Sequence, residues 1–206
     1  MVRTLGVLVA GGRGRRIGLA TPKALLRVGG MTLLERALAT LEPLCDEVVV
    51  AAPHGMTLPV PPRSLVEDWP GAAGPLAGLV AGLGARPHER ALVLGVDFPC
   101  LGPAALAALL ARLPGRAAVL PAPGGVPQPL ASAYGATAAS LLAERLRAGE
   151  RSVTAAALTL DPLLVPDVEL SGLEGGLVNF FNLNTPEDRE AAERALAARE
   201  RAGGAR

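Results

Sequence analysis

The sequence predicts an α/β fold: a three-layer α/β/α sandwich around a mostly parallel sheet, Rossmann-like in arrangement. Apolar runs of strand length alternate with amphipathic stretches of helix length over the first 120 residues, the pattern of repeated strand–helix units. The chain has 206 residues, 50% of them hydrophobic, which is enough to form one domain with a sizeable core. We therefore expect a single domain over residues 1–206, without internal repeats or a separating linker.

Charge and cysteine content exclude several classes of protein. Lys and Arg number 20 against 19 Asp and Glu, a net charge of +1, which argues against binding nucleic acid or membrane surfaces through bulk electrostatics. The two cysteines, Cys45 and Cys100, are too few for a disulfide framework or a zinc cluster. The apolar run near the N-terminus is too short to span a bilayer and lacks a signal-peptide layout. We expect a cytoplasmic protein that binds neither nucleic acid nor membranes.

In the first half of the chain, the elements follow each other closely. The run LGVLVA at 5–10 predicts a strand buried on both faces. Thr32 and Glu35 have capping-box spacing, which predicts a helix over 32–41. Further along, we predict strands at 47–52, 64–67, 91–96 and 117–120, and helices at 75–85 and 103–112.

The second half is less regular. Residues 121–129 (PAPGGVPQP) are rich in turn formers and predict no regular element. We predict a strand at 130–134, a helix at 136–148 that ends at Gly149, a short helix at 152–158, and a last helix capped by Thr185 with Pro186 at its first position. The tail from residue 199 onward is expected to fray.

A glycine-rich loop follows the first strand. It reads AGGRGRRIG over residues 10–18, which fits neither the phosphate-binding P-loop nor the dinucleotide fingerprint. Its backbone N–H groups and its three arginines, Arg13, Arg15 and Arg16, suit a triphosphate. The alternative is an ordinary turn in a glycine-rich chain.

Three charged residues are candidates for phosphate and metal chemistry. Lys23 is the one lysine among the 20 basic residues, and an ammonium near the glycine loop can contact a phosphate as a point charge. Asp97 directly follows the strand ALVLGV, and one carboxylate plus substrate phosphates suffices for Mg²⁺. Asp68 ends another short strand. The alternatives are a solvated surface lysine and two turn-forming aspartates. His54 and His88 lack the context of a catalytic triad.

Together these segments resemble the MobA-like family of nucleotidyltransferases, to which the molybdenum cofactor guanylyltransferases belong. The resemblance begins with VAGGRGRRIG at 9–18 and Pro22-Lys23. It continues through nearly the whole chain with Glu67-Asp68, GPLAG at 74–78, VDFP at 96–99, QPLA at 128–131 and FNLNTPED at 181–188.

The resemblance implies a fold, a reaction and residue roles. The fold is the Rossmann-like, glycosyltransferase-A-type nucleotidyltransferase fold, and the reaction is transfer of GMP from GTP to molybdopterin or Mo-molybdopterin with Mg²⁺ as cofactor. Residues 1–120 would bind the nucleotide and residues 121–206 the acceptor. Lys23 and Asp97 would be catalytic, with Asp97 also on the metal. Proteins that carry molybdopterin or mature molybdoenzymes are candidate partners. The nucleotide-binding residues would be Val9, Ala10, Gly11, Gly12, Gly14, Arg16, Lys23, Asp68, Gly78 and Asp97, and the acceptor-binding residues Gln128, Asn182 and Asn184.

Two departures from the family pattern leave alternatives open. Ala51 stands where family members often have Asn, so a contact to the base or ribose is missing or comes from elsewhere. The lysine lies in Thr21-Pro22-Lys23-Ala24 where Asp-Lys-Gly is more usual. A nucleotidyltransferase that uses CTP or a sugar-phosphate acceptor is one alternative. A non-catalytic nucleotide-binding adaptor is the other, although a pure binder needs no metal carboxylate beside the phosphates.

Overall fold

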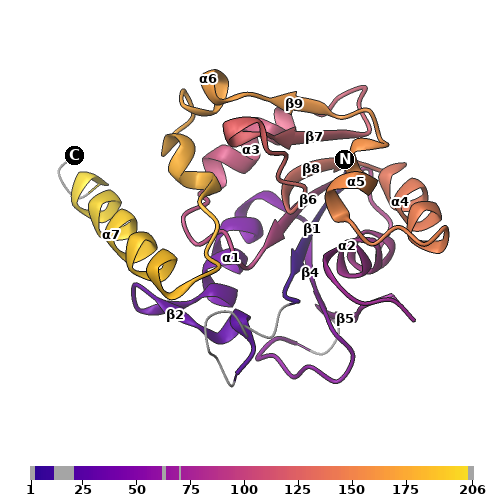
Figure 1. Cartoon of the computed structure of the whole chain (residues 1–206), viewed down its shortest axis with the longest axis horizontal. Helices are drawn as coiled ribbons and strands as arrows, with labels where there is room; N and C mark the ends of the chain where they lie inside the picture. The colour runs from indigo at the N-terminus through magenta and orange to yellow at the C-terminus, as the bar shows by residue number, and fades with distance from the viewer. Residues whose placement is uncertain (1–2, 12–20, 62–63, 70, 204–206) are drawn as a thin grey trace.

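Seven strands form the central sheet of this computed structural model, which describes residues 3–11, 21–61, 64–69 and 71–203 (Figure 1). Their order is β5-β4-β1-β6-β8-β7-β9. Neighbours pair in parallel except β8, which is antiparallel to both β6 and β7. The prediction of a mostly parallel sheet is confirmed. The strands are β1 (Thr4–Val9), β4 (Glu47–Ala52), β5 (Leu65–Glu67), β6 (Arg90–Gly95), β7 (Ala118–Pro121), β8 (Ala131–Gly135) and β9 (Leu163–Val165), and a separate small sheet pairs β2 (Arg27–Val28) with β3 (Met31–Thr32).

Strand β1 lies in the middle of the core, between β4 and β6. Its successive side chains point to opposite faces, and both faces are covered. Val7 packs into one hydrophobic cluster and Leu8 into the other, each without solvent exposure. This explains why the strand has a continuous apolar sequence instead of an alternating one.

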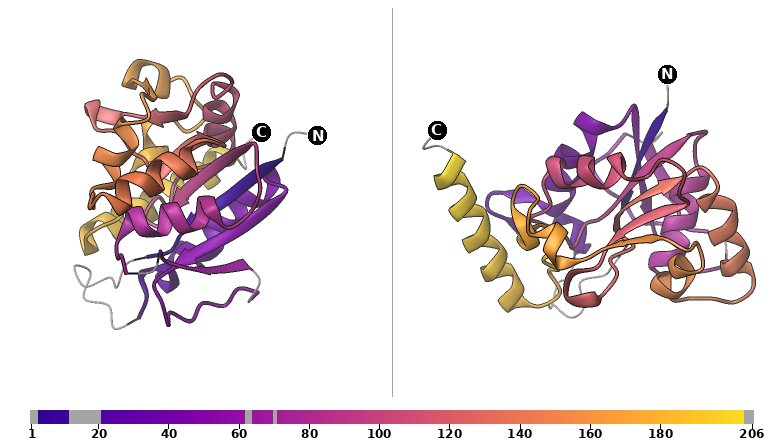
Figure 2. Two further views of the ribbon diagram at one scale, coloured as in Figure 1. Left: turned by 90° about the vertical axis from the view of Figure 1, so that its right-hand side faces the viewer. Right: turned by 90° about the horizontal axis from the view of Figure 1, so that it is seen from above.

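Helices cover both faces of the sheet (Figures 1 and 2). Helices α1 (Leu33–Leu41) and α3 (Pro103–Ala111) pack on one face, and α2 (Pro75–Gly84), α4 (Ala138–Arg147) and α5 (Val153–Leu158) on the other. The remaining helical segments are α6 (Asp167–Leu170), α7 (Pro186–Gly203) and the 3₁₀ turns η2 (Lys23–Leu25), η3 (Glu42–Leu44), η5 (Pro123–Gly125) and η6 (Gly176–Phe180). No helix in the described ranges is long and apolar enough to cross a membrane.

Side-chain caps confirm two of the predicted helix starts, whereas the helix predicted from residue 136 begins two residues later, as α4. Thr32 and Glu35 form the reciprocal capping box of α1, and the Ser152 side chain accepts a hydrogen bond from the N–H of Ala155 at the start of α5. Each bond satisfies a backbone N–H that has no partner within the helix.

The prediction of a frayed tail from residue 199 is wrong up to Gly203. Helix α7 continues to that residue and lies along one side of the molecule (Figure 1). Arg199 anchors it, because its guanidinium donates hydrogen bonds to the carbonyls of Cys100 and Gly175 and to Asn179 Oδ1. These tertiary contacts cannot be read from the local sequence, which is rich in Ala, Arg and Glu.

The strand directions determine which residues meet at one edge of the sheet. Strands β1, β4, β5 and β6 run parallel, so their carboxyl ends share that edge. Because β8 runs in the opposite direction, its first residues lie at the same edge. This is the edge at which open α/β sheets bind ligands.

Candidate functional site

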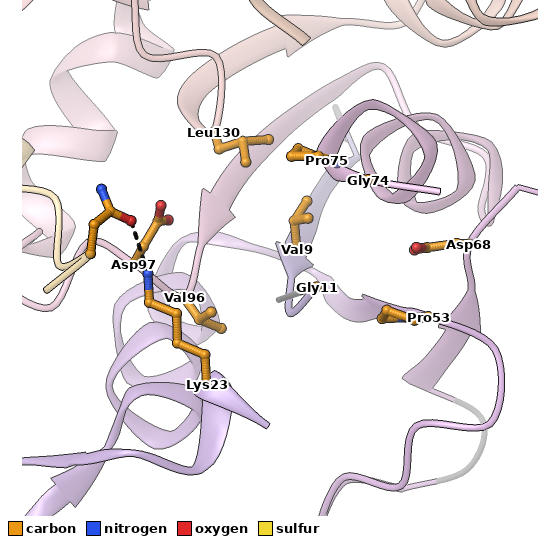
Figure 3. Close-up of a pocket in the computed structure, with 11 residues that line it drawn as sticks. Val9, Gly11, Lys23, Pro53, Asp68, Gly74, Pro75, Val96, Asp97 and Leu130 are labelled. Carbon is orange, nitrogen blue, oxygen red and sulfur yellow. Dashed lines mark hydrogen bonds between the residues drawn. The ribbon is translucent and has the colours of Figure 1, made fainter. Parts of the chain in front are cut away.

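A pocket of about 410 Å³ opens at this edge of the sheet (Figure 3). Its walls come from the ends of four parallel strands, the start of α2, the loop before β8 and the segment before α7. The lining residues are Val9, Gly11, Lys23, Pro53, Asp68, Gly74, Pro75, Val96, Asp97, Leu130 and Asn184. The pocket therefore draws on both parts of the chain, 1–120 and 121–206.

Lys23 enters the pocket from the first residue of η2. Only 8% of the residue is exposed, so it is not the solvated surface lysine that the sequence left open. Its Nζ donates a hydrogen bond of 3.2 Å to Asn184 Oδ1, a residue 161 positions further along the chain. The neutral amide oxygen of Asn184 thereby fixes the direction of the Lys23 side chain in the pocket.

Asp97 lies beside Lys23 on the same side of the pocket (Figure 3). It follows the carboxyl end of β6, and its main-chain carbonyl accepts a hydrogen bond of 2.8 Å from the N–H of Leu183. Burial raises the pKa of the Asp97 carboxyl, while the positive charge of Lys23 opposes that increase. The sequence-based expectation that an ammonium and a carboxylate share this edge is confirmed as a matter of position.

Asp68 lies on the opposite wall (Figure 3). Its N–H donates to the carbonyl of Ala52 at 2.9 Å, which fixes the end of β5 against β4. Burial also raises the pKa of this carboxyl. Gly78 of α2 lies behind Asp68, because a Cβ there would come within 3.1 Å of Asp68 Oδ1.

The three residues expected to bind an acceptor lie close together. Asn182 Nδ2 lies 3.5 Å from Gln128 Oε1, at the limit of a hydrogen bond. Asn182 Oδ1 is buried and has no hydrogen-bond partner among the described residues. Asn184 lines the pocket itself and binds Lys23. An unpaired buried carbonyl oxygen is costly, and a donor on a ligand would satisfy it.

A capping box fixes the position of Asn184. Asp188 Oδ2 accepts hydrogen bonds of 2.8 Å from the N–H groups of both Asn184 and Thr185, and the N–H of Asp188 donates to Thr185 Oγ1 at 3.2 Å. These bonds lower the pKa of Asp188. The cap of α7 thus holds the residue that binds Lys23.

The predicted nucleotide site differs from the observed pocket in several residues. Gly12, Gly14 and Arg16 lie outside the described residues, so their predicted contacts stay predictions. Ala10 and Gly78 are buried next to the pocket and are not among its described lining residues. Ala51 is fully buried and also does not line it.

Sequence reasoning assigned no site role to five of the described lining residues, although four of them lie in the quoted motifs: Pro53, Gly74, Pro75, Val96 and Leu130. Gly74 adopts φ +103° directly before α2, a conformation that favours glycine. The GPLAG motif was therefore a usable signal for Gly74 and Pro75. Leu130 belongs to the QPLA segment at 128–131, but its position at this edge depends on the antiparallel direction of β8, which the sequence did not predict.

The sequence is similar to a known family model and to several relatives. Residues 6–161 match the family model of the MobA-like NTP transferase domain. The probable molybdenum cofactor guanylyltransferase of Chloroflexus aggregans is 38% identical over 200 residues, 93% of this chain and 94% of the relative. The molybdenum cofactor guanylyltransferase of Desulfosudis oleivorans is 28% identical, with 94% of this chain and 96% of the relative covered.

Solved structures agree with the fold. The molybdopterin-guanine dinucleotide biosynthesis protein A of Archaeoglobus fulgidus superposes with a TM-score of 0.77 at 25% identity, covering 94% of this chain and 99% of that protein. The 2-C-methyl-D-erythritol 4-phosphate cytidylyltransferase of Thermus thermophilus gives a TM-score of 0.70 at 25% identity, covering 94% and 98%.

Proposed function

The chain belongs to the MobA-like NTP transferase family, and on that premise we propose that it transfers GMP from GTP to the phosphate of molybdopterin or Mo-molybdopterin, releasing pyrophosphate. The product is the guanine dinucleotide form of the cofactor. The proposal rests on one observation above others: Lys23 and Asp97 face the same pocket at the carboxyl edge of the sheet. Two relatives that align with nearly the whole chain are named molybdenum cofactor guanylyltransferases, which supports the choice of reaction.

The reaction is an in-line substitution at the α-phosphorus of GTP. An oxygen of the acceptor phosphate forms a bond to this phosphorus, and the bond from the phosphorus to the bridging oxygen of the β-phosphate breaks. The electron pair leaves with the pyrophosphate. This chemistry needs positioning and charge neutralisation more than covalent catalysis.

The charged and polar residues in and beside the pocket have different roles in this scheme. The Lys23 ammonium neutralises negative charge that develops on the leaving pyrophosphate, and Asn184 orients it through the 3.2 Å hydrogen bond. Asp68, on the opposite wall, contacts the nucleoside part of GTP. Gln128 and Asn182 are not among the described lining residues, but they neighbour Leu130 and Asn184, which are; in this scheme they contact the acceptor, and a donor on it would satisfy the unpaired Asn182 Oδ1.

Family nucleotidyltransferases use a divalent metal ion, and we propose Mg²⁺ here. The described residues include no group of three or more His, Cys, Asp or Glu side chains placed to hold a metal. A single partly buried carboxylate, Asp97, nevertheless fits a metal that arrives with substrate phosphates, because Mg²⁺ is typically held by one or two carboxylates together with phosphates and water. When bound, the ion would supply charge neutralisation at the reacting phosphates.

A product measurement tests the proposal. The purified chain is incubated with GTP, Mg²⁺ and molybdopterin, and the product is identified by mass spectrometry while pyrophosphate release is followed. We expect the guanine dinucleotide and one pyrophosphate per transfer. GTP that binds in equilibrium dialysis but is never consumed with acceptor present would contradict the proposal and favour a non-catalytic adaptor.

A second candidate is cytidylyl transfer, which one comparison favours. The 2-C-methyl-D-erythritol 4-phosphate cytidylyltransferase of Deinococcus radiodurans is 52% identical, but over only 66 residues, or 31% of this chain. Pyrophosphate release with each of the four NTPs, against molybdopterin, a sugar phosphate and methylerythritol phosphate, distinguishes the two candidates. Faster turnover with CTP and a polyol phosphate would favour the second.

A further inference from the structure

We infer that Gly95 is a positioning residue for Asp97: the absence of a side chain at position 95 lets the Asp97 carboxylate fold back over the end of β6 into its place beside Lys23. This inference rests on the proposed function and adds to it a residue that contacts neither substrate nor metal. Gly95 is the last residue of β6, two positions before Asp97, and it is buried.

Distances around Gly95 identify the contact. A Cβ added to this residue would lie 2.4 Å from Asp97 Oδ1 and 3.6 Å from Asp97 Cγ. Real Cβ atoms essentially never approach another heavy atom closer than 3.0 Å. Any residue other than glycine at this position is therefore incompatible with the observed Asp97 side-chain conformation.

The main chain around Asp97 is held on several sides, so it has little freedom to move away from an added methyl group. The N–H of Gly95 donates to the carbonyl of Leu130 at 2.6 Å, and the N–H of Val96 donates to the carbonyl of Val9 at 3.3 Å. The carbonyl of Asp97 accepts the 2.8 Å hydrogen bond from Leu183. The Asp97 side chain is the part that can rotate.

Because the side chain of Asp97 can rotate while its main chain is held, a substitution at Gly95 should affect catalysis more than stability. The close atom is the far end of a flexible side chain, whereas the other neighbour, Leu130 Cβ, would lie at 3.3 Å and needs to shift by only a few tenths of an ångström. Substituting Ala should thus leave the fold intact and displace the carboxylate by about 1 Å. A displacement of that size at a reacting centre can cost roughly 10²-fold in rate.

The test compares Gly95→Ala with two matched glycine substitutions. Gly84→Ala adds the same methyl group in α2, where no atom lies within 4 Å of the new Cβ. Gly82→Ala also lies in α2, but its Cβ would come 2.3 Å from Val7 Cγ1 in the core, so it reports on destabilisation alone. For each variant we measure the Tm, kcat and KM for GTP, and the binding of Mn²⁺ in the presence of GTP by electron paramagnetic resonance.

We expect Gly95→Ala to keep the Tm within a few degrees of the wild type while kcat falls roughly 10²-fold and Mn²⁺ binds more weakly. Gly82→Ala should lower the Tm and leave Mn²⁺ binding at 25 °C unchanged. Gly84→Ala should also leave Mn²⁺ binding unchanged, and its Tm should not fall, because Ala is a better helix former than Gly. In an Asp97→Ala background, adding Gly95→Ala should alter neither residual rate nor Mn²⁺ affinity, because the clash partner is gone.

Two results would overturn the inference. One is wild-type kcat and Mn²⁺ affinity in Gly95→Ala. The other is a further loss of either quantity when Gly95→Ala is added to Asp97→Ala. The proposed function fails separately, if the wild-type chain itself transfers no guanylyl group.

Discussion

Lys23 and Asp97 form a pair whose two members have different tasks. The lysine is almost fully buried, and a hydrogen bond to Asn184 orients it. The carboxylate beside it is partly buried, and this burial raises its pKa. Partial removal from water strengthens the interaction of either group with a phosphate or a cation. Single substitutions of Lys23 or Asp97 should therefore affect the reaction most.

Replacing Lys23 by Ala should lower kcat for guanylyl transfer by roughly 10²-fold, because one preorganised charge on the leaving group is lost. Lys23→Arg should restore little, since a planar guanidinium does not fill the place of a compact ammonium. Steady-state kinetics with varied GTP measures both effects, and Arg194→Ala on the exposed face of α7 is the control. An increase in KM with unchanged kcat would show that Lys23 only anchors the ground state.

Asp97→Asn keeps the shape of the side chain and removes its charge. We expect guanylyl transfer to fall to a small fraction of the wild-type rate, because a neutral amide binds a divalent cation much more weakly than a carboxylate. The far-ultraviolet circular dichroism spectrum should stay the same. Near-normal transfer by this variant would disprove the metal role of Asp97.

At the scale of elements, two devices hold the pocket walls. The capping box of α7 fixes Asn184, and the hydrogen bonds of β8 fix the loop that carries Leu130. The side chains of Ser132 and Tyr134 donate to the carbonyls of Gln128 and Pro129 at 2.6 and 2.8 Å. Both sets of hydrogen bonds hold pocket residues of the second half of the chain, and the contribution of each to stability can be measured separately from catalysis.

Asp188→Ala should reduce the free energy of unfolding by about 1 kcal/mol, as is usual for a lost helix cap, and should also lower kcat because Asn184 is no longer fixed. Glu35→Ala is the matched control. It removes the corresponding carboxylate of the α1 capping box, so it should lower stability without changing kcat. Urea unfolding and steady-state kinetics on the same preparations separate the two effects, and equal kcat in both variants would contradict the role of the α7 cap.

The contribution of Asp188 should also depend on pH. Its pKa is lower in the folded chain than in the unfolded one, because the backbone N–H groups of Asn184 and Thr185 bind the ionised form. The stabilisation is therefore complete above the ordinary Asp pKa of about 3.9 and is lost as the pH falls through the lowered value. The difference in Tm between wild type and Asp188→Ala should stay constant from pH 7 to 5 and shrink below pH 4. A difference in Tm that grows as the pH falls would contradict a lowered pKa of Asp188 in the folded chain.

Tyr134→Phe tests the second device. The Tyr134 side chain is fully buried, and its hydroxyl donates to the carbonyl of Pro129. Removing the hydroxyl should reduce stability by about 1 kcal/mol, measured by urea unfolding. Ser140→Ala is the control and should have a much smaller effect, because the Ser140 hydroxyl donates to the carbonyl of the exposed residue Thr137 at the start of α4.

For the whole molecule, the parts that the sequence predicts are those governed by local physics. Strand 47–52 was predicted with its observed bounds, because buried parallel strands have continuous apolar sequences. The starts of α1 and α5 were predicted because their capping residues lie only three positions from the N–H groups that they bind. Strand β9 was missed, since LLV is too short to stand out, and so was the direction of β8, because a short apolar run carries no directional signal.

The candidate site follows the same division. Asp97 could be predicted, because a carboxylate after a buried strand lies at the ligand edge of such a sheet. The hydrogen bond between Lys23 and Asn184 could not, since its partners are 161 residues apart. Nor could the place of Gly95 beneath Asp97, which depends on a side-chain conformation and not on a spacing.

The hydrogen bond between Lys23 and Asn184 has a consequence for how the protein is synthesised. A ribosome synthesises Lys23 161 residues before Asn184, so a growing chain can assemble the strands of the sheet while its pocket still lacks one wall. A chain that stopped before Asn184 would have the central strands but lack the residue that orients its lysine.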